Sequence, residues 1–325
     1  MTLRELAKLA HVSVSTVSKA FSGAEDISES TREMIFSLAK EHGCFGKYRR
    51  ESYDKKVIVC LVPEIQSEHY SGFVREIQKN VERLGGILLT CAYDFDPEKS
   101  RALFSYCTDH LRADGIITLD CDNIPVNRQR ELPVVTFGGS DDRNFDHIVT
   151  SMDDAMNRAV ALLKSHRHRS IAFIGEPLTQ KKAELFRKSM EQNGLFCPPQ
   201  AVITVHNRFE PAGEIGVRTL EKQFPSCTAA ICAYDRIAFG VIKELKRRGK
   251  EVPKDFSVIG SDNISVTEYF DRPLTTINTY TEETCRTVCE LLFQKIKSPF
   301  YTARRQIVIQ SDLVERETVA DAPNP

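Results

Sequence analysis

The chain has 325 residues, of which 41% are hydrophobic and 27% are charged, and its formal net charge is −1. This composition is ordinary for a soluble globular protein, and no stretch approaches the roughly 20 apolar residues of a membrane span. The length predicts a short module plus a larger, two-lobed one. The first residues lack the apolar region of a signal peptide, so we expect a cytoplasmic protein with no membrane partner.

The ten cysteines are scattered along the chain and form no CxxC pair. Cys285 and Cys289 are four residues apart, but no histidine stands near them at the spacing of a zinc site. We therefore expect buried, unpaired thiols and neither a metal nor a cofactor. No Gly-rich phosphate loop, Ser-His-Asp set or paired-carboxylate motif stands out, so an enzyme is not expected.

The first 45 residues have the pattern of three short helices. Thr2 and Glu5 form a capping box before the first helix, Ser13 and Ser28 can cap the next two, and Gly43 can end the third. The residues expected to face inward are Leu3, Leu6, Ala7, Ala10, Val17, Ala20, Phe21, Met34, Ile35, Leu38 and Ala39. Such a trio is typical of a helix-turn-helix DNA reader, and a plain packing module is the alternative.

The second of these helices would present small, hydroxylic or basic side chains to solvent. They are Val14, Ser15, Thr16, Ser18 and Lys19. Such side chains can approach base edges and phosphates closely. Residues 1–56 carry 10 Lys and Arg against 8 Asp and Glu, a local basic excess that the whole-chain charge hides. We assign residues 1–45 to a DNA-binding headpiece and residues 46–56 to a linker.

From residue 57 onward, short apolar runs alternate with amphipathic helical patterns, and the order begins again near Met152. We predict an α/β fold in which the small all-α domain precedes two similar, doubly wound parallel-sheet lobes. A ligand cleft is expected between the lobes, at the carboxyl ends of the strands. Residues 57–325 would therefore form a ligand-sensing and dimerisation domain. His166 and His168 form an H-x-H turn that we expect to be solvated.

The segment TLRELAKLAHVSVSTVSKAFSGAEDISESTREMIFSLAKEHG resembles the headpiece of LacI/GalR-family repressors. The stretches HRSIAFIG, TAAICAYDRIAFGVIKELKRRGKEVPKDFSVIGSDN and RPLTTIN resemble the periplasmic-binding-protein-like sensor of the same family, and the resemblance covers nearly the whole chain in the family's order. It implies that Val14, Ser15 and Lys19 read bases, while Thr16 and Ser18 contact phosphates. Lys19 stands where arginine is usual, so a bidentate contact to guanine is not available in the same form.

The linker departs from the family's pattern. It has no Pro-Asn, and Tyr53 falls about where the family has a leucine that enters the minor groove. Tyr53 is either such a wedge or part of a plain linker. The family's chain crosses between the lobes three times, here near Met152, Asn278-Thr279 and Tyr301–Arg304. Lobe one would then comprise about 57–151 and 280–301, and lobe two about 152–279 and 304–317.

Positions that match the family's cleft imply a set of ligand contacts. They are Glu64, Gln66, His69, Tyr70, Gly138, Lys182, Tyr234, Asp235 and Asp262. Carboxylates accept hydrogen bonds from hydroxyl groups and an aromatic ring packs on an apolar sugar face, so the set suits a sugar or another polyol. Asp235 could instead cap the helix that follows it, and Lys182 could be a solvated helix residue.

Together these features predict a homodimeric, sequence-specific transcriptional regulator of the repressor type. Its partners would be double-stranded operator DNA, a sugar-like effector and a second copy of the chain, and it would be associated with the nucleoid when bound. The stretches YSGFVREIQKNVERLGG and RIAFGVIKELKRR are expected to contribute to the dimer contacts. The main alternative is a solute-binding protein of a transport system, and a doubly wound enzyme is the second.

Overall fold

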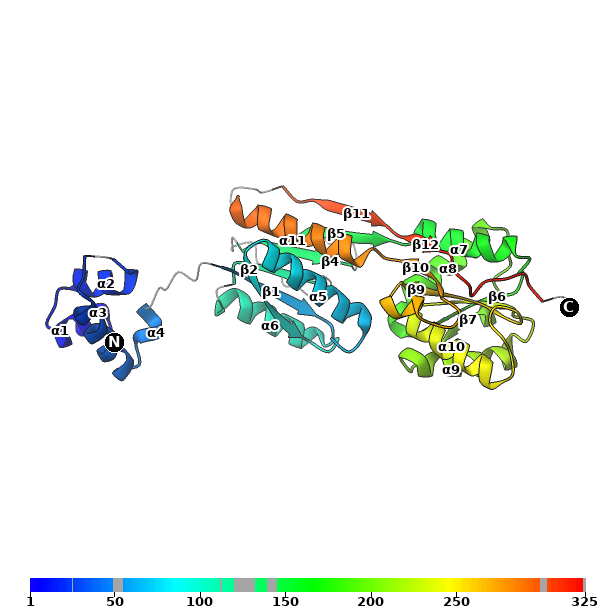
Figure 1. Ribbon diagram of the computed structural model, residues 1–325, viewed down its shortest axis with the longest axis horizontal. Helices are drawn as coiled ribbons and strands as arrows, with labels where there is room; N and C mark the ends of the chain where they lie inside the picture. Colours follow the sequence, from blue (N-terminus) through cyan, green and yellow to red (C-terminus); the bar gives the residue numbers. More distant parts are fainter. Residues whose placement is uncertain are drawn as a thin grey trace. The chain divides into compact units, whose positions relative to one another are not determined.

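The computed structural model describes residues 1–24, 26–48, 55–111, 113–119, 132–138, 145–298 and 303–323. The chain divides into two compact units, Met1–Lys56 and Val57–Pro325. The second unit contains two six-stranded sheets, each with helices packed against it (Figure 1). None of the described helices is long and apolar enough to cross a membrane.

The first unit is helical, and its caps are those that the sequence predicts. Its helices are α1 (Leu3–Leu9), α2 (Val14–Ser22), α3 (Glu29–Glu41) and α4 (Phe45–Tyr48). The Thr2 hydroxyl accepts from the Glu5 N–H, and the Glu5 carboxylate accepts from the Thr2 N–H at 2.7 Å. Ser13 and Ser28 cap α2 and α3 through their side chains. Local hydrogen-bonding chemistry therefore sets where these helices begin.

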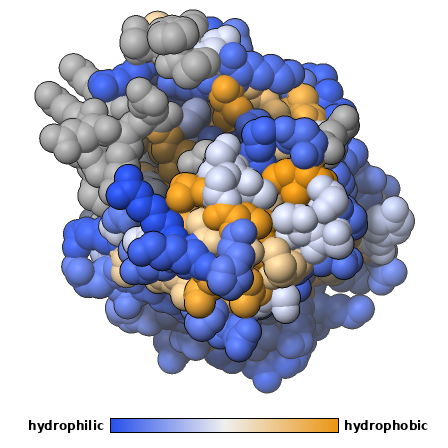
Figure 2. Space-filling view, turned by 90° about the vertical axis from the view of Figure 1, so that its left-hand side faces the viewer, coloured by the Kyte–Doolittle hydropathy of each residue, from blue (hydrophilic) through white to orange (hydrophobic). Residues whose placement is uncertain are grey.

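The core of this unit is mostly the predicted one. Leu6, Val17 and Ile35 are fully buried, but Met34 is 40% exposed, so its assignment to the core was wrong. The apolar stripe of α3 is narrow, and Met34 lies at its solvent edge. The space-filling view of Figure 2 likewise shows hydrophobic residues exposed between hydrophilic ones on the face that it draws.

Helix α4 adds residues that the sequence placed in the linker to the packing of the headpiece. Cys44 just before it is buried, and the rings of Phe21, Phe36 and Phe45 lie within 6.1 Å of one another. Tyr48 packs against Phe21, and its hydroxyl donates to the Met1 carbonyl at 2.7 Å. The packed headpiece therefore continues to Tyr48.

The first lobe of the second unit is a sheet in the order β11-β5-β4-β3-β1-β2. Its strands are β1 (Lys56–Val62), β2 (Gly86–Ala92), β3 (Gly115–Thr118), β4 (Val134–Phe137), β5 (Asp146–Ser151) and β11 (Gln306–Gln310). Its helices are α5 (Glu68–Arg83), α6 (Pro97–Asp109) and α11 (Thr281–Lys297). Helices α5 and α11 pack on one face of the sheet, and α6 covers the other.

The second lobe repeats this plan in the order β12-β10-β9-β8-β6-β7. Among its described strand pairs, β12 runs antiparallel to β10 and the others are parallel. Its strands are β6 (Ile171–Gly175), β7 (Val202–Thr204), β8 (Ala229–Cys232), β9 (Ser257–Asp262), β10 (Thr275–Asn278) and β12 (Asp312–Val314). Its helices are α7 (Asp153–Ser165), α8 (Gln180–Gln192), α9 (Phe209–Gln223) and α10 (Asp235–Arg247), with short 3₁₀ turns η1 (Pro177–Thr179), η2 (Pro199–Ala201) and η3 (Ser265–Glu268). The predicted fold class, a helical module and two parallel-dominated lobes, is confirmed.

The third crossing between the lobes differs from the prediction. Strand β11 pairs with β5 in the first sheet, from Gln306 with His147 to Gln310 with Ser151. The chain then reaches β12 in the second sheet, so the crossing lies at Ser311 and not at Tyr301–Arg304. The alternating pattern of β11 marks it as a strand, but it carries no information about which sheet it joins.

Helices α9 and α10 approach each other with their backbones almost in contact. A Cβ atom added to Gly240 of α10 would lie 2.0 Å from the Glu210 carbonyl oxygen, and one added to Gly213 of α9 would lie 2.1 Å from the Ile237 carbonyl oxygen. Only glycine fits at such a crossing. The close approach fixes the beginning of α9, which carries Phe209 and Glu210 to the carboxyl edge of the second sheet.

The H-x-H turn is not simply solvated. His168 is fully buried, and its ring nitrogens contact the hydroxyls of Thr228 and Ser257 and the Ala320 carbonyl at 2.8 to 3.0 Å. Burial lowers the pKa of His168, so its ring is neutral. His168 thus fastens the C-terminal segment to the second lobe, and the expectation of a solvated turn was wrong for this residue.

Candidate functional site

The outward face of α2 carries the residues that the sequence predicts to meet DNA. Val14, Ser15, Ser18 and Lys19 are exposed, while Thr16 is half-buried with its hydroxyl 2.8 Å from that of Ser13. The buried side of the same helix packs into the headpiece core. The face is therefore rigidly held and free of bulky side chains other than Lys19. Tyr53 lies outside the described residues.

Lys19 is not isolated on this face, because its ammonium group binds the carboxylate of Asp26 in the loop after α2. Both side chains are about half exposed, and the hydrogen bond from Lys19 lowers the pKa of Asp26. An exposed ion pair of this kind contributes little to stability. Lys19 can therefore leave Asp26 for a DNA acceptor at little cost.

A cavity of about 170 Å³ lies between the two lobes of the second unit, at the carboxyl ends of the strands. Its lining comprises Ser67, Glu68, His69, Tyr70, Phe95, Glu176, Leu178, Thr179, Lys182, Arg208, Phe209, Tyr234, Asp235, Arg236, Asp262 and Ile264. Six predicted ligand residues lie in this lining: His69, Tyr70, Lys182, Tyr234, Asp235 and Asp262. Residues that lie up to 193 positions apart along the chain thus meet at one place.

Three predicted residues do not line this cavity. Glu64 is buried behind it, where its carboxylate accepts from the Ser67 N–H at 3.0 Å and holds the turn before α5. Gln66 is exposed. Gly138 follows β4 with φ of +74°, a left-handed conformation that favours glycine.

Lys182 reaches the cavity from α8, and the structure does not place it on the solvated face of that helix. Its Nζ donates to the Ala233 carbonyl at 2.7 Å and lies 3.4 Å from Asp262 Oδ1. His69 Nδ1 lies 3.6 Å from the same carboxylate oxygen. Burial lowers the pKa of His69 and keeps its ring neutral. Asp262 has φ of +105°, so β9 ends in a strained turn that directs this residue at the cavity.

Asp235 does not cap α10, although it begins that helix. The N-cap is Tyr234, and the Asp235 carboxylate instead accepts from the Ile264 N–H at 2.9 Å and the Thr276 hydroxyl at 2.5 Å. The capping alternative for this residue was therefore wrong. Asp235 is only 1% exposed, and its burial and the nearby Asp262 carboxylate raise the pKa of Asp235 to about 8.

This raised pKa predicts how stability depends on pH. In the unfolded chain the pKa of an aspartate is about 3.9, so the folded protein binds one more proton than the unfolded chain between about pH 4 and pH 8, and stability falls as pH rises through that range. Asp235→Asn removes the charge: its Oδ1 can accept from the Ile264 N–H, and its Nδ2 can donate to the Thr276 hydroxyl, which then acts as the acceptor. Thermal unfolding from pH 5 to pH 8.5 should show a smaller decline for Asp235→Asn, which should exceed the wild type at pH 8. Parallel curves would contradict this assignment.

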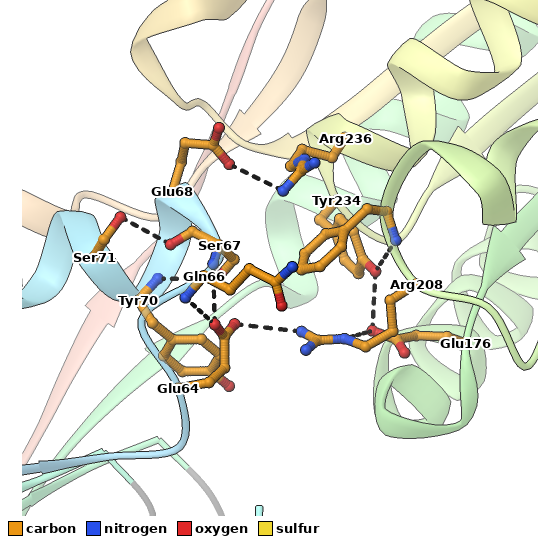
Figure 3. A network of polar contacts seen from close by, with 11 residues as sticks. Glu64, Gln66, Ser67, Glu68, Tyr70, Ser71, Glu176, Arg208, Tyr234 and Arg236 are labelled. Carbon is orange, nitrogen blue, oxygen red and sulfur yellow. Dashed lines mark hydrogen bonds and ion pairs between the residues drawn. The ribbon is translucent and has the colours of Figure 1, made fainter. Parts of the chain in front are cut away.

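Several cavity residues were not predicted from the sequence. They are Phe95, Glu176, Arg208, Phe209 and Arg236. Figure 3 shows how Arg208 and Arg236 extend from the second lobe toward Glu64 and Glu68 of the first lobe. Each follows a strand end or begins a helix, but nothing in its local sequence distinguishes it from an ordinary surface residue. Two of these residues, Phe95 and Phe209, have positive φ angles of +58° and +61°, a conformation that is uncommon for residues other than glycine and often occurs at functional sites.

The second lobe holds these residues in a connected polar network. The Tyr234 hydroxyl donates to Glu176 Oε1 at 2.9 Å and accepts from the Phe209 N–H at 3.0 Å. Burial raises the pKa of Tyr234, which therefore stays a neutral donor. The network fixes the ring of Phe209 at the cavity wall. The site can thus bind a small polar molecule through carboxylates, an amine, guanidinium groups and aromatic rings.

Two known families match separate parts of the chain. Residues 2–44 match the bacterial regulatory proteins of the lacI family, and residues 160–319 match the periplasmic binding protein-like domain. The chain therefore combines a LacI-family DNA-binding domain with a periplasmic-binding-protein-like domain. It is a DNA-binding transcriptional repressor with a sugar-binding-like sensor domain, and the predicted family is confirmed. The helix-turn-helix match disfavours the transport alternative.

Curated relatives match this LacI-family chain over most of their length. The repressor PurR of Vibrio cholerae (strain M66-2) is 25% identical over 334 residues, which are 98% of each chain. The repressor CytR of Escherichia coli (strain K12) is 27% identical over 292 residues, 85% of this chain and 84% of that protein. These relatives are transcriptional repressors and not enzymes, in agreement with the expectation from the sequence.

Solved structures share the fold. A complex of the regulator CelR with cellobiose has a TM-score of 0.71 at 22% identity, covering 98% of this chain and 99% of that chain. The lac repressor dimer bound to operator and an anti-inducer has a TM-score of 0.73 at 21% identity, with the same coverage. A LacI-family regulator from Enterococcus faecium with bound ribose has a TM-score of 0.70 at 23% identity, covering 82% of this chain and 99% of that chain.

Proposed function

We propose that this LacI-family repressor binds a specific operator through α2 and that a small metabolite in the interlobe cavity controls its operator affinity. The observation that carries the proposal is the presence, in one chain, of a DNA-reading helix and of a polar cavity formed by two lobes. A ligand that contacts both lobes stabilises one arrangement of them over others, and it can thereby bias the headpiece. Such a regulator acts in the cytoplasm, where its DNA lies.

Val14, Ser15 and Lys19 are the proposed base readers. Thr16 and Ser18 are proposed phosphate contacts, and Tyr53 is a proposed minor-groove contact from the linker. The exposed positions of Val14, Ser15, Ser18 and Lys19 on one helix support this division. Phosphate contacts position a protein on DNA, whereas base contacts specify its sequence.

Replacing Ser15 and Lys19 with alanine is therefore expected to relax sequence preference. Each lost base contact should lower the ratio of specific to nonspecific binding by about 5- to 150-fold, because good base contacts contribute about 1–3 kcal/mol of discrimination. Gel shifts with a selected operator and a scrambled duplex measure this ratio. Lys8→Ala removes the same charge from α1 and serves as the control. An equal loss on both duplexes would show that Ser15 and Lys19 do not read bases.

The effector is proposed to be a sugar or a sugar derivative. Hydroxyl-binding carboxylates of Asp262 and Glu176 and the rings of Tyr70 and Phe209 line one cavity, which supports this class. The similar regulators CelR and the Enterococcus faecium protein carry cellobiose and ribose. A thermal-shift screen of sugars, sugar phosphates and nucleosides tests the class. A strong shift by nucleosides alone would contradict it.

A second copy of the chain is the proposed partner of a groove beside α10 that has apolar side chains surrounded by charged ones. Phe239 stacks on Phe270 with ring centroids 4.4 Å apart, and Ile242 and Val252 line the same groove. The similar lac repressor structure is a dimer. Light scattering should give the mass of a dimer for the wild type, and Phe270→Asp should shift it toward the monomer. A wild-type mass of one chain would contradict the proposal.

A further inference from the structure

The described cations that line the cavity are all paired by the protein itself. Lys182 is the first example, because an ammonium group has three N–H donors and its Nζ contacts three acceptors. These are the Ala233 carbonyl at 2.7 Å, the Ser261 hydroxyl at 3.3 Å and Asp262 Oδ1 at 3.4 Å. Lys182 thus has no donor left for an anionic ligand.

Arg236 is also paired, in its case with two carboxylates. Its Nε and Nη2 donate to the two carboxylate oxygens of Glu210, both at 2.8 Å, and its Nη1 lies 3.7 Å from Glu68 of the first lobe. The guanidinium carbon also lies 4.1 Å from the centre of the Phe209 ring. A bidentate pair of this kind is among the strongest charged contacts that a side chain makes.

Arg208 joins the two lobes. Its Nε lies 3.3 Å from Glu176 of the second lobe, and its Nη2 lies 3.5 Å from Glu64 of the first. Figure 3 draws both contacts. Its guanidinium carbon lies 5.2 Å from the centre of the Phe95 ring and 4.6 Å from that of Phe209. Glu176 is only 4% exposed, so an anion that bound Arg208 in its place would leave a buried carboxylate without its cationic partner, which is costly.

The charges of the described lining residues therefore balance. Lys182, Arg208 and Arg236 supply three positive charges, and three acids oppose them. Those acids are Glu68, Glu176 and Asp262. Asp235 adds little negative charge near neutral pH because its pKa is raised to about 8. A phosphate or carboxylate would enter without a matching cation and would face carboxylates instead.

The volume of the cavity independently limits the size of the ligand. Its volume is about 170 Å³. A protein cavity of about 150 Å³ holds one six-membered ring, and pockets for drug-sized ligands are about 300–1,000 Å³. The cavity therefore fits a single ring and not an extended, multi-ring compound.

We propose that the cleft selects an uncharged, single-ring polyhydroxy compound, a monosaccharide or cyclitol, and excludes its phosphate ester, because each arginine and lysine of the described lining is already paired with a carboxylate of the protein. This inference rests on the proposed function and narrows its ligand class. A hydroxyl group can donate a hydrogen bond to one of these carboxylates without separating any ion pair. A phosphate group has to take a cation away from its carboxylate partner.

Isothermal titration calorimetry of the full-length protein tests this inference with three probes at matched ionic strength. They are inorganic phosphate, the pair ribose and ribose 5-phosphate, and the pair glucose and glucose 6-phosphate. We expect no heat of binding from inorganic phosphate up to millimolar concentrations, and no ester that binds as tightly as its parent sugar. Saturable phosphate binding, or an ester that binds more tightly than its parent, would overturn the proposal.

A variant in which Arg208 loses its acidic partners is expected to bind inorganic phosphate. Glu64→Gln with Glu176→Gln keeps the size of both side chains but releases Arg208, so inorganic phosphate should bind at least tenfold more tightly than to the wild type. Glu64→Gln alone should give a smaller gain and covers the case in which the double variant fails to fold. No gain in a folded variant would also overturn the proposal. Operator gel shifts on the same samples report the proposed function separately, because they do not depend on which ligand class binds.

Discussion

Replacement of Gly240 by alanine is expected to lower the free energy of unfolding of the sensor by about 3 kcal/mol or more. Overpacking a core usually costs about 1–3 kcal/mol of stability, and we expect the cost at this site to lie at the top of that range or above it. The added Cβ would lie 2.0 Å from the Glu210 carbonyl oxygen and 2.8 Å from its carbon, both of them backbone atoms that cannot rotate away. Helices α9 and α10 would have to separate.

The melting temperature should accordingly fall by roughly 6–12 °C, because 1 kcal/mol corresponds to about 2–4 °C for a domain of this size. Gly72→Ala is the matched control. Gly72 also lies within a helix, α5, but a Cβ there meets nothing within 4 Å. Alanine should leave stability unchanged or raise it by up to about 1 kcal/mol. Equal melting temperatures for the two variants would show that α9 and α10 do not pack as described.

The second large effect concerns Asp262, whose change to asparagine should abolish most of the effector response. Asparagine has nearly the same shape and tolerates a positive φ, so the turn at +105° should survive. Hydrogen bonds to a charged group contribute about 1.5–3 kcal/mol, so effector affinity should fall roughly 10- to 150-fold. Calorimetry with the effector found by the thermal-shift screen measures this loss.

Operator binding by Asp262→Asn should stay within about threefold of the wild type, because Asp262 belongs to the sensor and not to the headpiece. Asp153→Asn is the control for the loss of one carboxylate, since Asp153 is 61% exposed and pairs with Lys188 outside the cavity. An effector affinity that Asp262→Asn leaves unchanged would remove Asp262 from the site.

The headpiece illustrates what the sequence predicts well. The capping hydroxyls of Ser13 and Ser28 and the glycine after α2 act within four residues of the backbone groups that they satisfy, so their pattern is visible along the chain. The alternation of apolar strands and helices predicts the two lobes for the same reason. Met34 shows the limit, because helical spacing does not say how wide the buried stripe is.

Long-range pairing is what the sequence does not show. The assignment of β11 to the first sheet depends on contacts with β5, which lies more than 150 residues earlier. Arg208 and Glu64 are likewise 144 residues apart and meet because each follows the carboxyl end of a strand, one in each sheet, at the same cleft. Asp235, by contrast, is a cavity candidate through its match to the family's cleft, whereas its hydrogen bonds to Ile264 and Thr276 depend on the fold.

The central claim is that DNA affinity depends on what occupies the interlobe cavity. The most direct test is a fluorescence-anisotropy titration of the protein with an operator selected from random duplexes, at physiological salt, with and without the saturating effector. We expect specific binding at least about 10³-fold tighter than nonspecific binding, and a shift of about 5- to 150-fold in operator affinity on adding the effector. Equal affinity for all duplexes, or an operator affinity that a bound effector does not change, would contradict the claim.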